Sequence, residues 1–156
     1  MDIFPHTHQI HLLFGGIIML KRILLATLAV FVAWQLLDYV IHGVILMGAY
    51  EDTKELWRPM EEFKFVAMYV QAILVALFFT TVYGWLIKPK SMKNALLYGF
   101  LIGLAFGTSM GYGTYSWMPI PYFMAFTWFL GTTVKFIVAG LLLGLIVKDA
   151  TPAADA

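Results

Sequence analysis

The sequence predicts an all-α fold, an integral membrane four-helix bundle with both termini in the cytoplasm. Of the 156 residues, 62% are hydrophobic and only 12% are charged, whereas a soluble domain carries about 25% charged residues. The apolar residues fall into four blocks, each with about the 20 residues that a helix needs to cross a bilayer. All six prolines lie outside these blocks, so they remove no hydrogen bond from the predicted helices.

The predicted spans are residues 23–47, 63–87, 95–115 and 123–147. None of them alternates polar and apolar residues as the strands of a membrane barrel do, so helices are the expected crossing form. The transmembrane domain is therefore predicted over residues 19–148, with an N-terminal extension over 1–18 and a disordered tail over 149–156.

The predicted extension contains three histidines, His6, His8 and His11. It lacks the charged start and the small-residue cleavage site of a signal peptide. Its last residues and Met19 read Gly-Gly-Ile-Ile-Met, which is what translation of a ribosome-binding site would give, so Met19 is an alternative start. The histidines have no carboxylate partner and no fixed geometry, so no metal site is expected.

Lysine and arginine residues set the predicted orientation, because the cytoplasmic loops of membrane proteins carry an excess of them. Six lie on one side of the spans, at Lys21, Arg22, Lys88, Lys90, Lys93 and Lys148. On the other side, acidic residues dilute the basic ones, and the second loop there, residues 116–122, has no charge. We therefore place both termini in the cytoplasm.

The first external loop holds four apolar residues at helical spacing, with acidic residues between them: Leu56, Trp57, Met60 and Phe63. One interpretation is a short amphipathic segment that lies on the outer membrane surface. The alternative is a solvated acidic loop.

The third span carries a glycine at every fourth position, at Gly99, Gly103, Gly107 and Gly111. Small residues at this spacing leave one helix face almost free of side chains, so another backbone can approach closely. We predict a glycine zipper, with the third span either central in the bundle or paired with its copy in a homodimer.

Three ionisable side chains lie inside the predicted spans. Asp38 and His42 are four residues apart in the first span and so share a helix face, and Lys135 lies at the middle of the fourth. Each buried charge costs about 2.5–3.5 kcal/mol on insertion scales, which favours pairing. At the rise of an α-helix, Asp38 lies about 22 Å and Lys135 about 18 Å from the inner ends of their spans. We therefore predict that the two residues pair.

Further polar residues are predicted near the same level and complete a candidate intramembrane polar site: Gln35, Gln71, Thr108, Ser109, Tyr112 and Thr132. Two interpretations stay open. In one, Asp38 and Lys135 form a structural ion pair that fixes which helices meet. In the other, Asp38, His42 and Lys135 line a polar cavity that binds a ligand or moves protons.

Other features argue against several classes of function. The chain has no cysteine, which removes disulfides, iron–sulfur clusters and thiolate metal sites. Its net charge of +1 argues against nucleic-acid binding. No H-E-x-x-H, G-x-S-x-G or phosphate-loop motif is present. We therefore expect no enzymatic activity, no metal and no cofactor.

The segment Asp38-Tyr39-Val40-Ile41-His42-Gly43, followed by Tyr50, resembles the first span of small bacterial four-helix membrane proteins of unknown function. Gly111-Tyr112-Gly113-Thr114-Tyr115 and Trp128-x-x-Gly131-Thr132 resemble parts of their third and fourth spans. The resemblance covers most of residues 38–145 and implies a four-helix fold with no settled activity. His42 and Thr127 depart from the pattern, where an apolar residue and an acid are usual, so a shared ligand does not follow.

The first hypothesis for the function is a non-enzymatic integral membrane protein, either a small subunit or a small-ligand binder, that acts through helix packing. The alternative is a small proton- or ion-linked transporter or channel that uses Asp38, His42 and Lys135. The expected partners are the lipid bilayer and a homo-oligomer or a larger membrane complex. Compact spans and short loops favour the bacterial inner membrane.

Overall fold

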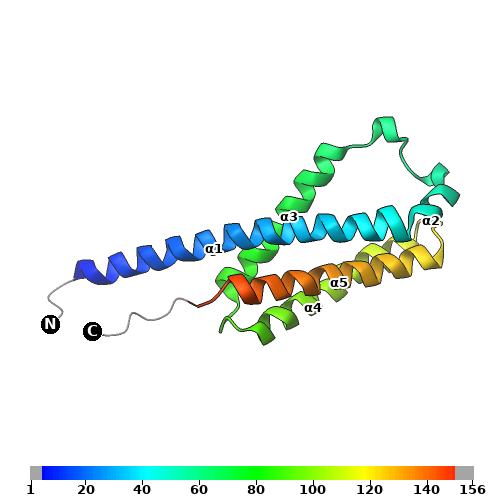
Figure 1. The fold of residues 1–156 in the computed structure, drawn as a ribbon. Coiled ribbons are helices and arrows are strands. Elements are labelled where there is room, and N and C mark those ends of the chain that lie inside the picture. The colour runs from blue at the N-terminus through cyan, green and yellow to red at the C-terminus, as the bar shows by residue number, and fades with distance from the viewer. Residues whose placement is uncertain (1–4, 150–156) are drawn as a thin grey trace.

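The computed structural model describes the backbone of residues 5–149 and the side chains of residues 15–149. The predictions for His6, His8, His11 and residues 150–156 lie outside the described side chains. The helices are α1 (Pro5–Val40), α2 (Met47–Asp52), α3 (Phe65–Leu86), α4 (Met92–Thr108) and α5 (Tyr122–Ile146), arranged as in Figure 1. All of them except α2 belong to segments long and apolar enough to cross a membrane, which confirms the predicted fold class of four membrane-length helices.

The helices differ from the predicted spans in their bounds and in their helix type. α1 begins at Pro5, well before the predicted start at residue 23, and α3 begins at Phe65 instead of residue 63. The first and third spans each continue into a π-helical segment, Ile41–Ile45 and Ser109–Gly113. Such segments occur frequently at functional sites. In addition, α4 begins three residues earlier than predicted, because Ser91 caps it by accepting a hydrogen bond from the backbone N–H of Asn94.

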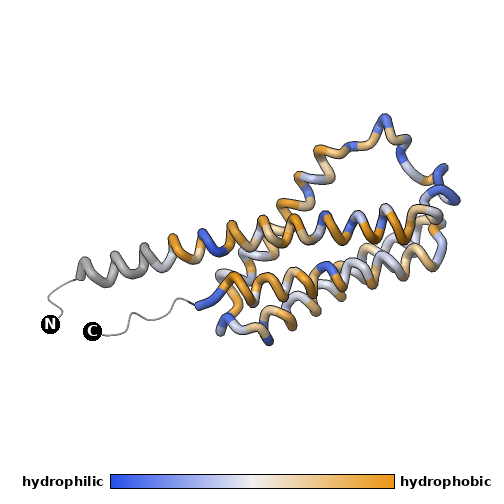
Figure 2. Tube along the Cα trace, viewed as in Figure 1, coloured by the Kyte–Doolittle hydropathy of each residue, from blue (hydrophilic) through white to orange (hydrophobic). Residues whose placement is uncertain are grey.

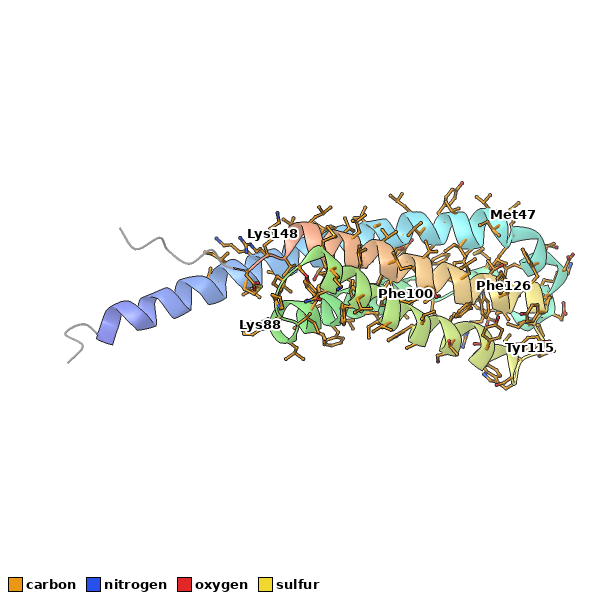
Figure 3. The ribbon with its side chains drawn as sticks, turned by 90° about the horizontal axis from the view of Figure 1, so that it is seen from below. Met47, Lys88, Phe100, Tyr115, Phe126 and Lys148 are labelled. Carbon is orange, nitrogen blue, oxygen red and sulfur yellow. The ribbon has the colours of Figure 1, made fainter. Side chains whose placement is uncertain are left out.

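Polar residues mark the two ends of the bundle. Hydrophilic residues concentrate at both ends, while the helices between them are mostly apolar (Figure 2). Lys88 and Lys148 mark one end, and Met47 and Tyr115 mark the other (Figure 3). We call these the Lys148 end and the α2 end. Arg22 also belongs to the Lys148 end, because it donates a hydrogen bond to the backbone carbonyl of Lys148 at 2.5 Å.

α5 packs against both α1 and α4. The glycines at every fourth position of the third span are buried and face α5: Gly99, Gly103, Gly107 and Gly111. A Cβ atom added at Gly103 would lie 2.9 Å from the carbonyl oxygen of Thr133, and one at Gly107 would lie 2.6 Å from that of Phe129. These distances leave no room for a side chain. The glycine face of α4 is therefore covered by α5 of the same chain.

Three aromatic rings connect α1, α3 and α5 in the core. The ring centroid of Trp34 in α1 lies 6.2 Å from that of Phe79 in α3 and 4.8 Å from that of Phe136 in α5. All three residues are buried. Closer to the Lys148 end, the hydroxyls of Thr27 and Thr80 share a buried hydrogen bond of 2.6 Å that joins α1 to α3. We call the three rings the aromatic layer.

α3 packs on the bundle through only one of its halves. Its buried residues all lie between Ala76 and Gly84, whereas residues 65–71 are all exposed. Figure 1 shows the first half of α3 leaning away from α1. The helix α1 is therefore covered by α3 towards the Lys148 end and not towards the α2 end.

The loop between α2 and α3 does not form one amphipathic helix. It contains two 3₁₀ turns, Lys54–Leu56 and Met60–Glu62. Leu56 and Trp57 pack against the core cluster at the α2 end, whereas Met60 is 72% exposed. The four apolar residues of this loop therefore divide between the bundle and its surroundings, because the 3₁₀ turns break their helical spacing.

The contact between α4 and α5 gives a first prediction. Gly103→Ala should lower the free energy of unfolding in detergent by about 1–3 kcal/mol, the usual cost of overpacking. The measurement is thermal unfolding followed by circular dichroism. Gly16→Ala is the matched control, because no atom lies within 4 Å of the added Cβ. Alanine is the better helix former, so the control should keep or gain stability. Equal effects of the two changes would contradict the close contact.

Candidate functional site

A charged pair joins α1 to α5 within the membrane-length segments. Lys135 Nζ donates hydrogen bonds to both carboxylate oxygens of Asp38, at 2.6 and 2.7 Å. The predicted pairing of these two residues is therefore present. Trp34 positions the lysine, because its indole N–H donates to the Lys135 carbonyl at 2.9 Å. Its ring centroid also lies 5.5 Å from Lys135 Nζ, within cation–π range.

His42 lies one helical turn beyond Asp38 and connects the pair to Tyr50 and Trp128. Its Nδ1 is 2.7 Å from the Tyr50 hydroxyl, which accepts a hydrogen bond from the Trp128 indole N–H at 3.1 Å. An indole N–H can only donate, so the hydrogen of Tyr50 is free to bond His42 Nδ1. We assign the proton of the neutral imidazole to Nε2, because this nitrogen faces the Asp38 carboxylate, with 3.6 Å between Nε2 and Oδ1. We call the following five residues the polar network: Asp38, His42, Tyr50, Trp128 and Lys135.

An aromatic cluster at the α2 end holds Tyr50 in place. The rings of Tyr50 and Trp57 meet edge to face at 5.3 Å, and those of Trp57 and Trp128 do so at 6.1 Å. The Trp57 indole N–H donates to the Thr53 hydroxyl at 2.9 Å, and that hydroxyl donates to the Ala49 carbonyl at 2.7 Å. The loop after α2 thus fixes the α2 side of the polar network.

The polar network is only partly covered. The side chains of Lys135, Asp38 and His42 are 18%, 31% and 39% exposed. Asp38 follows Thr27 by eleven residues, about three helical turns, and so lies on the same face of α1. At Thr27 this face packs on α3. α3 has no buried residue before Ala76, and its first half leans away from α1 (Figure 1), so α3 covers this face of α1 at Thr27 and not further towards the α2 end.

Towards the Lys148 end the network meets an apolar core. The aromatic layer of Trp34, Phe79 and Phe136 comes first, and Val30 and Ala139 lie beyond it, both fully buried. Within residues 15–149, no hydrogen bond links the network to the threonine pair below this layer. The network is therefore open to one side of the bundle and closed towards the Lys148 end.

Three of the predicted polar residues lie near the network or in small contacts of their own. Gln35 and Thr132 are half-buried, and their side chains make no hydrogen bond in the described part of the chain. The Tyr112 hydroxyl lies 3.4 Å from that of Tyr122. None of the three contacts the Asp38–Lys135 pair through a hydrogen bond.

The other three predicted residues lie on outward faces, away from the network. Gln71 is exposed on the half of α3 that leans away, and Thr108 and Ser109 are exposed beside the glycine face of α4. The depth of a residue in a span can be counted from the sequence, but the direction of its side chain depends on which helix faces pack. The expected single polar layer is therefore not formed by these residues.

Two members of the network, Tyr50 and Trp128, were not among the predicted site residues. Trp128 precedes Lys135 by seven residues, about two helical turns, so this spacing could have placed both on one face of α5. Tyr50 reaches His42 through the π-helical segment Ile41–Ile45 and the start of α2. No periodicity in the sequence indicates that path.

The ion pair gives a second prediction. Asp38→Ala alone should destabilise the protein more than Asp38→Ala combined with Lys135→Ala, because one unpaired charge is worse than none. Since Asp38 is 31% exposed, the loss should be below the roughly 3–5 kcal/mol typical of fully buried pairs. Unfolding by dodecyl sulfate in mixed micelles measures it. Equal damage from the single and the double change would remove the pair as a stabilising contact.

Tyr50 gives a prediction of pH dependence. Burial raises the pKa of Tyr50 to about 12, the charge of Asp38 acts in the same direction, and the hydrogen bond from Trp128 opposes both. A raised phenol pKa stabilises the fold below the ordinary value of 10.0, and this stabilisation is lost as the pH rises towards 12. The difference in absorbance at 295 nm between the wild type and Tyr50→Phe isolates this titration. A midpoint near 10 would contradict the buried position.

The chain matches no protein-family model, no curated protein and no solved structure. The resemblance of the Asp38 and Trp128 segments to small bacterial four-helix membrane proteins stays a prediction. A function for the chain is therefore inferred from the polar network and from the helices that hold it.

Proposed function

We propose that the chain is a non-enzymatic multi-pass membrane protein that binds a small ligand at the polar network. The observation that carries this proposal is the incomplete cover of a charged group inside a membrane-length helix. Asp38 and His42 are 31% and 39% exposed, although intramembrane ionisable residues normally face a bundle interior or a water-filled cavity. A ligand that occupies the open side would complete the cover.

A purely structural role for the pair is less consistent with this geometry. An ion pair whose only role is to set the register of two helices is expected to be fully covered by protein. Its favourable interaction energy depends on a dry environment in which every polar group is hydrogen-bonded. The side chain of His42 adds a donor that the pairing does not need, and its Nε2 lies 3.6 Å from the Asp38 carboxylate, beyond a normal hydrogen bond. This spare donor favours a binding site.

A transporter or channel remains the alternative function. The hydrogen-bonded path from Trp128 through Tyr50 to His42 favours it, since it runs from the α2 end to within 3.6 Å of Asp38. Transport also needs access from the other side. The buried aromatic layer lies in that direction, so ligand binding is the better supported proposal.

The proposal includes a place and an orientation. Basic residues at the Lys148 end support a cytoplasmic location for both termini, and the α2 end is then external. We also propose that the membrane is a bacterial inner membrane and that α4 and α5 are joined by a glycine zipper. The chain is further proposed to be a subunit of a homo-oligomer or of a larger complex.

Ligand binding can be tested without knowledge of the ligand. The full chain is extracted in a lipid-preserving copolymer, and the small molecules that it retains are identified by mass spectrometry. We expect one compound in near-stoichiometric amount with the wild type. It should be lost from the variant that carries both Asp38→Asn and Lys135→Gln, which removes both charges and leaves neither unpaired.

Thr108→Val is the matched control, because it removes a polar side chain that is exposed on α4, away from the network. This variant should retain the compound in full. The proposal fails if the wild type retains no compound in stoichiometric amount, or if the charge-free variant retains as much as the wild type.

The orientation gives a further prediction. Alkaline phosphatase fused after residue 156 should be inactive and green fluorescent protein at the same position should fluoresce, because the C-terminus is proposed to be cytoplasmic. Phosphatase fused after residue 55, in the loop that follows α2, should be active. An active C-terminal phosphatase would reverse the orientation.

A further inference from the structure

In a bilayer, the part of α1 that α3 leaves uncovered would face lipid. The face of α1 that carries Asp38 is the one that packs on α3 at Thr27. The first half of α3 leans away from it (Figure 1), and residues 65–71 of that half are all exposed. In a bilayer, lipid fills the angle between the two helices. A molecule dissolved in the membrane can therefore approach the network sideways.

The depth of the network restricts which molecules can do so. Asp38 precedes Ile45, the last residue of the first membrane-length segment, by seven residues, which is about 10 Å along a helix. The charged pair therefore lies well inside the hydrocarbon, whose half-thickness is about 15 Å. The ester groups of glycerolipids stay at the edge of this region. The ligand needs a polar group that itself enters the hydrocarbon.

The charges of the network exclude a ligand with a net charge. Lys135 and Asp38 lie 2.6 Å apart and neutralise each other. A carboxylate that approached Lys135 would meet the negative charge of Asp38, and an ammonium group that approached Asp38 would meet Lys135. At low dielectric such like charges repel strongly. An uncharged polar group fits best.

The hydrogen-bond inventory then sets the type of polar group. The Lys135 ammonium has three N–H donors, and its hydrogen bonds to the two oxygens of Asp38 leave one. With its proton assigned to Nε2, His42 supplies another donor, because Asp38 Oδ1 at 3.6 Å is too far to accept a normal hydrogen bond from it. Both available groups are donors, so the ligand must bring an acceptor. A carbonyl oxygen is an uncharged acceptor that carries no donor of its own, so it suits two donors that converge on one point.

We propose that the polar network binds a carbonyl of a prenylated quinone, which enters sideways between α1 and the first half of α3. A quinone is uncharged, its ring carries carbonyl acceptors, and its isoprenoid chain keeps it in the hydrocarbon. In this arrangement His42 Nε2 and Lys135 Nζ donate to the carbonyl oxygen. The inference rests on the proposed ligand-binding function and specifies the class of ligand.

The test uses the full chain in nanodiscs of phosphatidylcholine, with ubiquinone-1 as the probe. Binding is followed by quenching of tryptophan fluorescence, and the infrared carbonyl band of the quinone reports the hydrogen bond. The wild type should bind with a saturable isotherm and shift the band to lower frequency. Simple partition into the lipid gives a linear response and no shift.

Two variants of His42 separate a donor from a merely structural side chain. His42→Phe removes the N–H and should weaken binding at least tenfold and abolish the band shift. His42→Gln places an amide N–H near the position of Nε2, so it should keep the hydrogen bond and bind within about threefold of the wild type. The tenfold loss expected for His42→Phe corresponds to about one hydrogen bond. Thr108→Val is the control outside the network and outside the entry path, because Thr108 is exposed on α4, and it should bind like the wild type. Circular dichroism checks the fold of each variant.

Competition with two charged amphiphiles tests the charge argument, and competition with an uncharged glycerolipid tests the depth argument. Decanoate, decyltrimethylammonium and dioctanoylglycerol should not displace the quinone. The inference is overturned if the isotherm is linear, if His42→Phe binds as tightly as Thr108→Val, or if any of these competitors displaces the quinone at equal concentration.

These outcomes can be told apart from a failure of the proposed function. If the wild type retains a compound that the charge-free variant loses, and ubiquinone-1 does not bind, the network binds a ligand of another class and only this inference fails. If no compound is retained and ubiquinone-1 does not bind, both fail.

Discussion

The ion pair between Asp38 and Lys135 is the contact on which the arrangement of α1 and α5 depends. Apolar burial does little to bring helices together in lipid, so specific polar contacts and close packing decide which helices meet. Either charge alone would cost about 2.5–3.5 kcal/mol on insertion scales. Their bidentate contact at 2.6 and 2.7 Å fixes both the level and the rotation of one helix relative to the other. Trp34 adds a third contact at the same level.

α5 combines this polar contact with a different one on its other side. Lys135 and Trp128 point to α1 and the residues that follow it, whereas the backbone at Phe129 and Thr133 lies against the glycines of α4. The first kind of contact is directional and chemically distinctive, and the second depends only on the absence of side chains. Together they make α5 the common support of the bundle, and α3 attaches through α1 and the aromatic layer.

The sequence was sufficient to predict features that depend on neighbouring residues or on the number of residues along one helix. Span lengths follow from hydropathy, and the depths of Asp38 and Lys135 follow from the helical rise, so the pair could be predicted. The directions of Gln71, Thr108 and Ser109 depend on which helix faces pack, and depth alone does not determine them. The lean of α3 and the π-helical segment Ile41–Ile45 leave no periodic pattern in the sequence from which they could be predicted.

The threonine contact between Thr27 and Thr80 has a mechanical consequence. It holds α3 near one end, while residues 65–71 are all exposed. Because α3 is held near one end, the lateral pressure of one leaflet would act mainly on its first half. A thicker or more crowded leaflet would change the tilt of α3 and so widen or narrow the way to Asp38. Bilayer composition would thereby set how readily the charged pair is reached, with no change in the pair itself.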